Sequence, residues 1–356
     1  MSTKTNPYKA VSFSESAVKA ALDRCGYLIA DTKYDGVRGN ILVDNVGDAR
    51  WWSRVSKPIP ALEHLNGYDK RWKDLLKDDR CIYPDGFMLD GELMVKEVDF
   101  NTGSGYLRTK RLKETNYQFD QVMHDLPIGV NFKKDKLRFH LRKDKLKVVL
   151  YAVVPLHVIE EEGAEHNVMN LLMPNHVNYM VGLLNEYFPE IEWCLSESCD
   201  VYDMIELNAL YEKRREEGNE GLVVKDPMDI YKRGKKTGWW KMKPECEADG
   251  IIQGLVWGTK GLANEGKVIG FEVLLESGRV VNATNISRAL MEEFTGNELT
   301  HTGKVDMGDY QRDYTISYYA GFACQISYME ETPDGSLRHP SFTKFRGTED
   351  NPTEKM

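Results

Sequence analysis

The sequence predicts an α+β fold in two domains, in which helices flank antiparallel sheets and a small β domain ends the chain. The chain has 356 residues with 41% hydrophobic content, which is enough for two domains. Amphipathic helical and short strand-like segments are mixed up to residue 243, and the pattern then becomes mostly β with one short helix. We therefore expect one domain over residues 1–243 and a second over 244–356.

Composition argues against several classes of protein. The sequence has no run of about 18 apolar residues and its N-terminus lacks an apolar core, so we expect neither a membrane span nor a signal peptide. The six cysteines form no Cys-x-x-Cys pair, which fits a reducing cytoplasm and argues against a zinc module. The net charge of −9 argues against a general nucleic-acid binder, although the local field decides such binding.

The N-terminal domain begins with a predicted helix over residues 12–27. Ser12 and Glu15 fit a capping box, and Gly26 fits its C-terminal stop. Residues 112–147 are polar and weakly patterned, so we expect an exposed insertion there. Strands are predicted at 27–31, 39–43, 87–95, 146–159 and 221–226, and helices at 175–188 and 200–221.

The C-terminal domain reads as strands within 249–258, 268–285 and 322–347, with a short helix at 287–294. Hairpin signals stand at 276–278 and 333–335. About 110 residues of this pattern fit an OB-fold β-barrel, although other small β folds fit the pattern equally well.

Charged residues interrupt four of the apolar strands. Charges rarely enter a core strand without partners, so their recurrence predicts one shared polar cleft. Strand alternation places Asp90 and Glu92 on one face. The other charges are Lys33, Asp35 and Arg38 in "DTKYDGVRGN", Glu220 and Lys225 around "GLVV", and Lys241 and Lys243 in "GWWKMKP".

These residue types together predict phosphoryl or nucleotidyl transfer. A half-buried lysine such as Lys33 can act as an amine nucleophile, and the fork of Arg38 suits phosphate or ribose oxygens. Carboxylates bind Mg²⁺, and cations stabilise a phosphoryl group during transfer. No P-loop or kinase signature is present. For Lys-x-Asp-Gly alone, a surface hairpin with an ion pair is an equal explanation.

The motifs resemble those of the covalent nucleotidyltransferases, meaning DNA ligases, RNA ligases and mRNA capping enzymes. "KYDGVR" matches the Lys-x-Asp-Gly-x-Arg signature, and "SR", "LDGEL", "LYAVV", "EGLVVK" and "WWKMKP" follow in the family's order over residues 33–243. The whole chain is similar to the small ATP-dependent DNA ligases of T-seven-type phages. The resemblance implies an adenylation (nucleotidyltransferase) domain, an OB domain, and the sealing of nicks in duplex DNA during replication, repair and recombination.

The resemblance also implies a role for each matched position. Lys33 would attack the α-phosphate of ATP to form lysyl-AMP; the AMP would pass to the 5′-phosphate of a nick, and the 3′-hydroxyl would then expel it. Arg38 and Arg54 would contact ribose or the nick phosphate, and Lys241 and Lys243 would contact the α-phosphate. Tyr151 would stack on adenine, and Asp31 and Thr32 would contact its edge. Lys225 would line the nucleotide pocket. Glu92 and Glu220 would hold Mg²⁺ or the ribose hydroxyls, and Asp35 could orient Lys33 or hold the metal. For Tyr151, a core tyrosine in an apolar strand is the alternative.

The last motif departs from the family pattern. "RHPSFTKFRGTED" keeps Arg338, Pro340, Phe342 and Arg346, but Ser341 replaces an arginine and the Asp-Lys ending is absent. Among Lys344, Arg346 and Asp350, we choose Arg346 as the residue that orients pyrophosphate. The resemblance implies that the OB domain closes over ATP and then clamps DNA, with a hinge over 243–249.

DNA contact is expected through phosphates rather than bases. The stretch 231–243 carries six Lys/Arg and no acid, and we expect Lys232, Arg233, Lys235 and Lys236 to contact DNA. The stretch 133–147 is a second basic candidate. We expect a monomer in the cytoplasm of a host cell, with no membrane contact.

Other members of the same superfamily remain alternatives. A capping enzyme would charge Lys33 with GMP, and an RNA ligase would join RNA ends. An NAD-dependent ligase would need an extra N-terminal domain and a four-cysteine zinc finger, which the sequence lacks. A non-catalytic OB protein would have little reason to keep the nucleophile with Glu92, Glu220, Lys241 and Lys243.

Overall fold

Two compact units make up the chain, Met1–Met242 and Lys243–Met356. The computed structural model describes residues 4–113, 131, 134, 136–304, 317–331 and 336–346, without the side chains of residues 101 and 300–304. Some sequence-based expectations lie outside the described residues. They are residues 114–130 of the expected insertion, parts of the basic stretch 133–147, the hairpin signal at 333–335, and Asp350.

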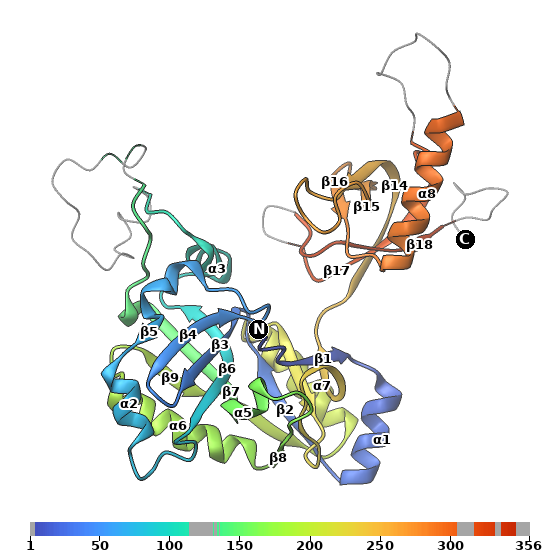
Figure 1. Ribbon diagram of the computed structural model, residues 1–356. Helices are drawn as coiled ribbons and strands as arrows, with labels where there is room; N and C mark the ends of the chain where they lie inside the picture. The colour runs from blue at the N-terminus through green and yellow to red at the C-terminus, as the bar shows by residue number, and fades with distance from the viewer. Residues whose placement is uncertain are drawn as a thin grey trace. The chain divides into compact units, whose positions relative to one another are not determined.

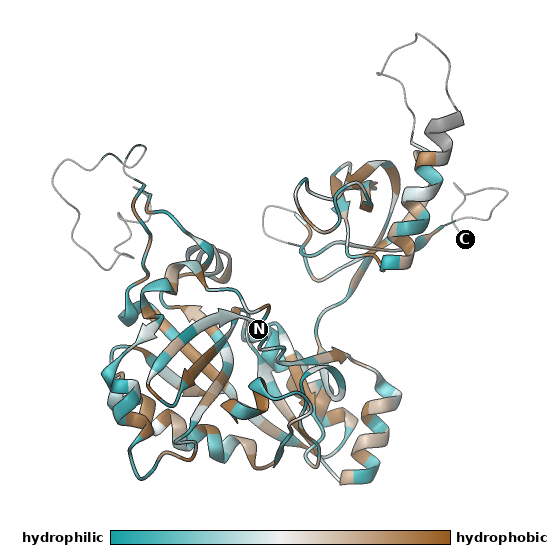
Figure 2. Cartoon of the chain, viewed as in Figure 1, coloured by the Kyte–Doolittle hydropathy of each residue, from teal (hydrophilic) through white to brown (hydrophobic). Residues whose placement is uncertain are grey.

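A six-stranded sheet forms one half of the N-terminal unit (Figure 1). Neighbouring strands are antiparallel except β7 and β9, which are parallel. Its order is β5 (Gly67–Tyr68), β4 (Asp48–Ser53), β3 (Val37–Asp44), β6 (Gly86–Val95), β7 (Leu146–Pro155) and β9 (Glu192–Leu195). Figure 2 shows long hydrophobic stretches on these strands, which fits the burial of the sheet.

A five-stranded sheet forms the other half. Its order is β1 (Tyr8–Ser12), β13 (Gly234–Met242), β11 (Gly221–Lys225), β2 (Leu28–Lys33) and β10 (Ser198–Val201). Only the β1–β13 pair is parallel among these strands. A small ladder joins β8 (His166–Met169) and β12 (Ile230–Tyr231). The predicted antiparallel character is confirmed, with one parallel pair in each large sheet.

Helices cover the outer sides of the sheets (Figure 1). In α1, Val18 and Ala21 are buried against Leu28 and Leu222, so an apolar stripe fixes the helix on the five-stranded sheet. Helix α6 packs on β7 and β9, and α7 packs on β10 and β11. The helices are α1 (Glu15–Cys25), α2 (Lys70–Leu76), α3 (Phe100–Arg108), α5 (Leu156–Glu160), α6 (Met173–Tyr187) and α7 (Met204–Glu216), with 3₁₀ turns η1 (Pro60–Leu65) and η2 (Lys143–Lys145).

The structure corrects three local expectations. The N-cap of α1 is Ser14 rather than Ser12, because Ser12 still belongs to β1. The apolar run after Pro155 turns into α5 instead of continuing as strand. Phe139 and Leu141, inside the stretch expected to be an exposed insertion, are fully buried in the main core.

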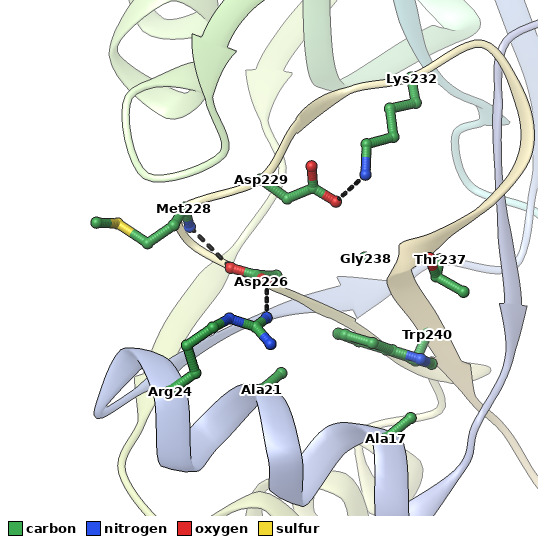
Figure 3. A pocket seen from close by; sticks show the side chains of 10 residues that line it. All are labelled: Ala17, Ala21, Arg24, Asp226, Met228, Asp229, Lys232, Thr237, Gly238 and Trp240. Carbon is green, nitrogen blue, oxygen red and sulfur yellow. Dashed lines mark hydrogen bonds and ion pairs between the residues drawn. The ribbon is translucent and has the colours of Figure 1, made fainter.

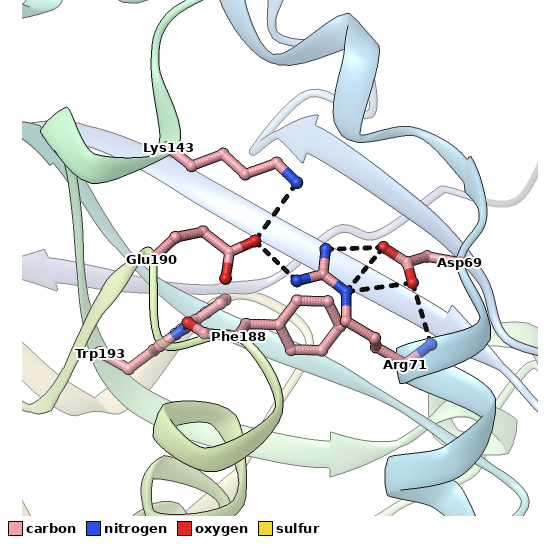
Figure 4. Close-up of polar contacts among 6 residues, drawn as sticks. All are labelled: Asp69, Arg71, Lys143, Phe188, Glu190 and Trp193. Atoms are coloured by element: carbon pink, nitrogen blue, oxygen red, sulfur yellow. Dashed lines mark hydrogen bonds and ion pairs between the residues drawn. The ribbon is translucent and has the colours of Figure 1, made fainter.

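A cluster of charges ties α2 to the turn before β9 (Figure 4). Arg71 donates to Asp69 at 2.8 Å and to Glu190 at 2.7 Å, and its guanidinium lies 4.4 Å from the ring centre of Phe188. Lys143 donates to the same Glu190 oxygen at 3.3 Å. Every one of these charges already has an opposite charge beside it, so we assign the cluster a role in stabilising the fold.

A buried histidine predicts an acid-sensitive step in stability. Burial lowers the pKa of His166 from 6.5 to about 4. Between these values the unfolded chain binds the proton and the folded chain does not, so stability falls as pH drops from about 6.5 to 4, by up to about 3 kcal/mol. Urea unfolding at pH 7.5 and 5.0 should show this loss reduced in His166→Gln. The same substitution at the exposed His157, whose charge is the smallest of the contributions that lower the pKa of His166, should reduce the loss far less. An equal slope in all three proteins would contradict the assignment.

The C-terminal unit is a curled five-stranded sheet with one long helix. The order is β16 (Val280–Ala283), β15 (Val268–Leu275), β14 (Cys246–Trp257), β17 (Ala323–Tyr328) and β18 (Ser341–Phe345), and α8 (Arg288–Lys304) lies between β16 and β17 in sequence. Phe271, Phe294 and Phe342 form its aromatic core. The predicted β domain with one helix is confirmed, but the described strands form no closed barrel: the edge strands meet at the single bridge Thr284–Ser341.

The link between the units is shorter than the expected hinge. Residues 246–249 already pair with β17, so only 243–245 lie outside the strands. No helix in the described part of the chain is long and apolar enough to cross a membrane.

Candidate active site

Strand alternation sorts the polar residues of the five-stranded sheet. Lys33 pairs with Gly221 and Asp31 pairs with Val223, which in turn pairs with Lys241, so these positions share one face. The other face packs on α1 and α7 through apolar residues such as Leu222. Thr32 pairs with Leu222, so its side chain lies on that helix-covered face, away from Asp31 and Lys33. The Thr32 side chain therefore does not face Asp31 and Lys33, and a role for Thr32 at the adenine edge stays a prediction.

Lys33 ends β2 and forms an ion pair with Glu220. The Glu220 N–H donates to the Lys33 carbonyl at 2.9 Å, which holds the two residues together through the backbone as well. The next residue, Gly221, has φ of 144° and a Cβ there would lie 2.1 Å from the Met242 carbonyl. A glycine is therefore required for β11 to start where it presents Glu220 to the lysine.

Glu92 is a second carboxylate near the same lysine. Burial raises its pKa to about 7, against the opposing effects of Lys33 and Arg38, and Glu220 raises it further. Gly36 allows this close approach, since a Cβ there would meet the Glu92 side chain at 2.6 Å. A carboxylate that titrates near neutral pH beside a cationic amine is a typical feature of an active site.

Arg38 is held by a carboxylate from the neighbouring strand β6. Its Nε and a terminal nitrogen donate to the two oxygens of Asp90 at 2.9 and 2.7 Å. The guanidinium carbon lies 5.3 Å from the ring centre of Tyr151 on β7. Asp90 is fully buried, so this pair fixes both the plane and the position of the guanidinium.

Lys225 and Asp31 form a buried ion pair on the same face as Lys33. Burial raises the pKa of Asp31, and Lys225 opposes that shift. The Lys225 ammonium also lies 4.1 Å from the ring centre of Trp239 and 5.9 Å from that of Tyr151. The two aromatic rings meet edge to face, with centroids 6.4 Å apart. Trp239 is buried and stacks on Tyr8, so this corner of the site offers the half-buried ring of Tyr151 together with a buried polar pair.

The remaining predicted site residues lie outside the group of contacts around Lys33, Arg38 and Lys225. Arg54 follows β4 and its side chain is exposed, while Asp35 is half-buried in the turn after Lys33. Lys243 lies one residue past β13. Arg346 belongs to the C-terminal unit, where its Nε donates to Asp249 at 3.0 Å.

The expected DNA-contacting residues fall into two groups. Lys232 is paired with Asp229 at 2.6 Å, and Arg233 donates to the Lys4 carbonyl at 2.7 Å. Lys235 and Lys236 are exposed, and among the described residues no ion pair engages them. Lys9 on β1 is also exposed and stands beside Lys235 in the strand register, an addition that sequence reasoning missed.

A separate pocket of about 430 Å³ opens on the helix-covered side of the five-stranded sheet (Figure 3). Both cations that line it are paired with carboxylates, Arg24 with Asp226 and Lys232 with Asp229. It offers no unpaired positive charge for a phosphate and does not contain Lys33, so we do not place the reaction there.

Sequence reasoning missed several groups behind the site. Asn40, Tyr231 and Trp239 contact Asp90 or Lys225, yet none of them stands at a distinctive spacing in the sequence. For the predicted metal ligands, no group of three or more His, Cys, Asp or Glu side chains arranged to hold a metal occurs in the described ranges. Glu92 and Glu220 remain as two carboxylates near Lys33.

The site combines a paired lysine that can act as nucleophile, two nearby carboxylates and an arginine with a fixed orientation. Two sheets carry these residues, and a small β unit follows them in the chain. This combination defines a nucleotidyl-transfer enzyme. A family model described as the ATP dependent DNA ligase domain matches residues 7–243, and one described as the DNA ligase C-terminal domain matches 244–346. The chain belongs to the ATP-dependent DNA ligase family.

Similar proteins agree with this assignment. The chain is 66% identical to the DNA ligase of Escherichia phage T7 over 100% of both chains, and 66% identical to the DNA ligase of Enterobacteria phage T3 over 99% of both. A solved structure, the ATP-dependent DNA ligase from bacteriophage T7 in complex with ATP, matches with a TM-score of 0.64 and 66% identity, over 97% of this chain and 100% of that one. The predicted resemblance and the activity of an ATP-dependent DNA ligase, which seals nicks in DNA, are thus confirmed.

Proposed function

We propose that Lys33 is the nucleophile of this ligase and that the face it shares with Asp31, Lys225 and Lys241 is the ATP site of the unit Met1–Met242. The observation that carries the proposal is the Lys33–Glu220 ion pair at the end of β2, beside Glu92. The Lys33 amine would attack the α-phosphorus of ATP, so that an N–P bond forms and the bond to pyrophosphate breaks. Glu220 already contacts the amine and is placed to take its proton.

The other roles follow from position. The ring of Tyr151 with the Asp31–Lys225 pair would receive the base, and Arg38 would hold ribose or phosphate oxygens. Lys241 and Lys243 would contact the α-phosphate. Arg54 would meet the nucleotide or the nick phosphate from the exposed end of β4, and Arg346 would orient pyrophosphate from the C-terminal unit, which we propose to act as an OB domain over 244–356.

Glu92 and Glu220 fit a Mg²⁺ ion that is completed by substrate oxygens. The raised pKa of Glu92 arises from burial and from the nearby carboxylates, and a bound cation would offset both. Mg²⁺ commonly uses one or two carboxylates and the substrate phosphates, and it would neutralise charge on the phosphates. Asp35 would act only as an outer partner.

The test is covalent labelling without DNA. Protein mixed with Mg²⁺ and ATP or GTP labelled at the α-phosphate is denatured, and the label on the chain is counted. Label from ATP alone, lost when EDTA is added, is the expected result. Label from GTP would indicate capping chemistry, and the absence of label would overturn the proposed site. We also propose that the enzyme acts as a monomer without membrane contact. We place it in the host cytoplasm, a location that the phage origin of its relatives supports.

Lys235 and Lys236 are expected to bind the DNA backbone. Their double substitution to Gln removes two exposed cations, so the affinity for nicked duplex should fall about tenfold at 50 mM salt and the log–log salt slope should decrease by about 2. Fluorescence anisotropy at several salt concentrations measures both.

Lys70 provides the matched control, because it is an exposed lysine on α2 that is already paired with Asp74. Lys70→Gln should leave affinity and slope unchanged. An unchanged slope in the double variant would remove this surface from the DNA interface.

A further inference from the structure

Asp90 has every acceptor position filled. One of its oxygens accepts from Arg38 Nε at 2.9 Å and from Asn40 Nδ2 at 2.8 Å. The other accepts from an Arg38 terminal nitrogen at 2.7 Å and from the Tyr231 hydroxyl. A carboxylate accepts about four hydrogen bonds, so Asp90 has no capacity left for a substrate or metal. Its role is to orient Arg38, of whose five N–H groups two are used here.

Tyr231 is fixed from a different part of the chain. The Tyr8 backbone N–H donates to the Tyr231 hydroxyl at 3.1 Å, so the hydroxyl proton is directed to Asp90. Tyr231 is 2% exposed, and its ring meets those of Tyr8 and Trp239 edge to face, at centroid separations of 5.9 and 5.8 Å. The hydroxyl can therefore neither turn to water nor move away from Asp90.

The result is a continuous chain of contacts between the two sheets. It runs from the Tyr8 backbone on β1 through Tyr231 and Asp90 to Arg38 on β3, which lies at the Tyr151 ring. Asp90 balances the Arg38 charge, and a buried network of this kind has few alternative arrangements once every partner is satisfied. Arg38 would lose part of its fixed orientation if one donor to Asp90 were removed.

We propose that Tyr231 is a positioning residue for ATP binding, which acts on the nucleotide through Asp90 and Arg38 without touching it. This inference rests on the proposed ATP site. Tyr231→Phe keeps the ring and removes only the hydroxyl. Because the lost contact is to a charged group, we expect the apparent KM for ATP, measured as the ATP concentration at half the maximal single-turnover rate of lysyl-AMP formation, to rise about tenfold. The maximal rate constant should stay within about twofold of wild type.

Tyr83→Phe is the matched control. The Tyr83 hydroxyl is also inside the protein, between His166 at 3.0 Å and His176 at 2.8 Å, but it has no contact with Asp90 or Arg38. Both variants lose a hydroxyl and some stability, so both are assayed at a temperature where unfolding curves show them folded. Only Tyr231→Phe should change the KM for ATP.

Arg38→Lys separates positioning from a general structural effect. Lysine keeps the charge beside Asp90 but has no planar fork, so adding Tyr231→Phe to Arg38→Lys should change KM by less than about twofold. The inference is overturned if Tyr231→Phe raises the KM for ATP about tenfold both in the wild type and in Arg38→Lys. It is also overturned if Tyr231→Phe alone has the KM of the wild type. Wild-type protein in the same series must take label from ATP. If it does not, the proposed ATP site itself fails. That outcome differs from a Tyr231→Phe variant whose KM for ATP equals that of the wild type, which overturns only the role of Tyr231.

Discussion

Lys33→Ala and Lys33→Arg are both expected to take no label from ATP and to seal no nicks, a loss of ~10⁴-fold or more. Lys33 is half-buried and paired with Glu220, whereas Lys225, which also ends a strand, is buried and paired with Asp31. Arginine keeps the positive charge but is not a usable nucleophile, so it separates charge from chemistry. The measurement is the rate of lysyl-AMP formation and the yield of sealed product.

The same variants should still act on a nick that already carries AMP. Lys33 is not consumed in that last step, in which the 3′-hydroxyl displaces AMP from the 5′-phosphate. Sealing of a pre-adenylated nick should therefore survive in Lys33→Arg, within about tenfold of wild type. Loss of this step as well would indicate a folding defect, and persistent ATP labelling in either variant would show that another residue is the nucleophile.

Glu92→Gln is expected to change activity and stability in opposite directions. The folded pKa of about 7 lies above the ordinary value of 4.5. Between these values the folded state binds more protons than the unfolded state, so stability falls as pH rises through this window and the cost is complete above about pH 7. At 1.36 kcal/mol per pKa unit the cost is at most about 3 kcal/mol, and partial exposure reduces it to about 1–2 kcal/mol.

The uncharged amide should therefore stabilise the protein at pH 8 and change little at pH 4.5. It should also slow adenylation at least about 100-fold, because a carboxylate for Mg²⁺ is lost. In the wild type, adenylation should decline as pH falls below about 7. Urea unfolding at the two pH values and adenylation rates from pH 5.5 to 8.5 test this. A destabilised Glu92→Gln at pH 8 would show that the carboxylate is structural.

The local fold was predictable where hydrophobic periodicity or turn chemistry is strong. Gly26 ends α1 with a φ of 78°, and Gly278 turns the β15–β16 hairpin with a φ of 81°. The parallel pairings of β1 and β9 were not predictable, because pairing partners far apart in sequence leave no local signal. The start of α5 was missed because short apolar runs do not distinguish strand from helix.

The site was predictable where charges interrupt apolar strands. Alternation placed Asp90 and Glu92 together, and the motif order identified the family. Thr32 lies on the opposite face from Asp31 and Lys33, because adjacent strand residues face opposite sides. The partners of Asp90 could not be predicted, since Asn40 and Tyr231 gain their role only when the two sheets meet.

The edge position of β1 sets how far the N-terminus can be shortened. β1 is the border strand of its sheet and covers β13, and Tyr8 stacks on Trp239 with centroids 4.4 Å apart. Removing residues 1–12, and with them all of β1, would leave nine-residue β13 and its tryptophans as an open edge, which invites pairing between molecules. Lys9 now gives that border a charge. Truncation through β1 would therefore replace a charged border strand with an aggregation-prone one.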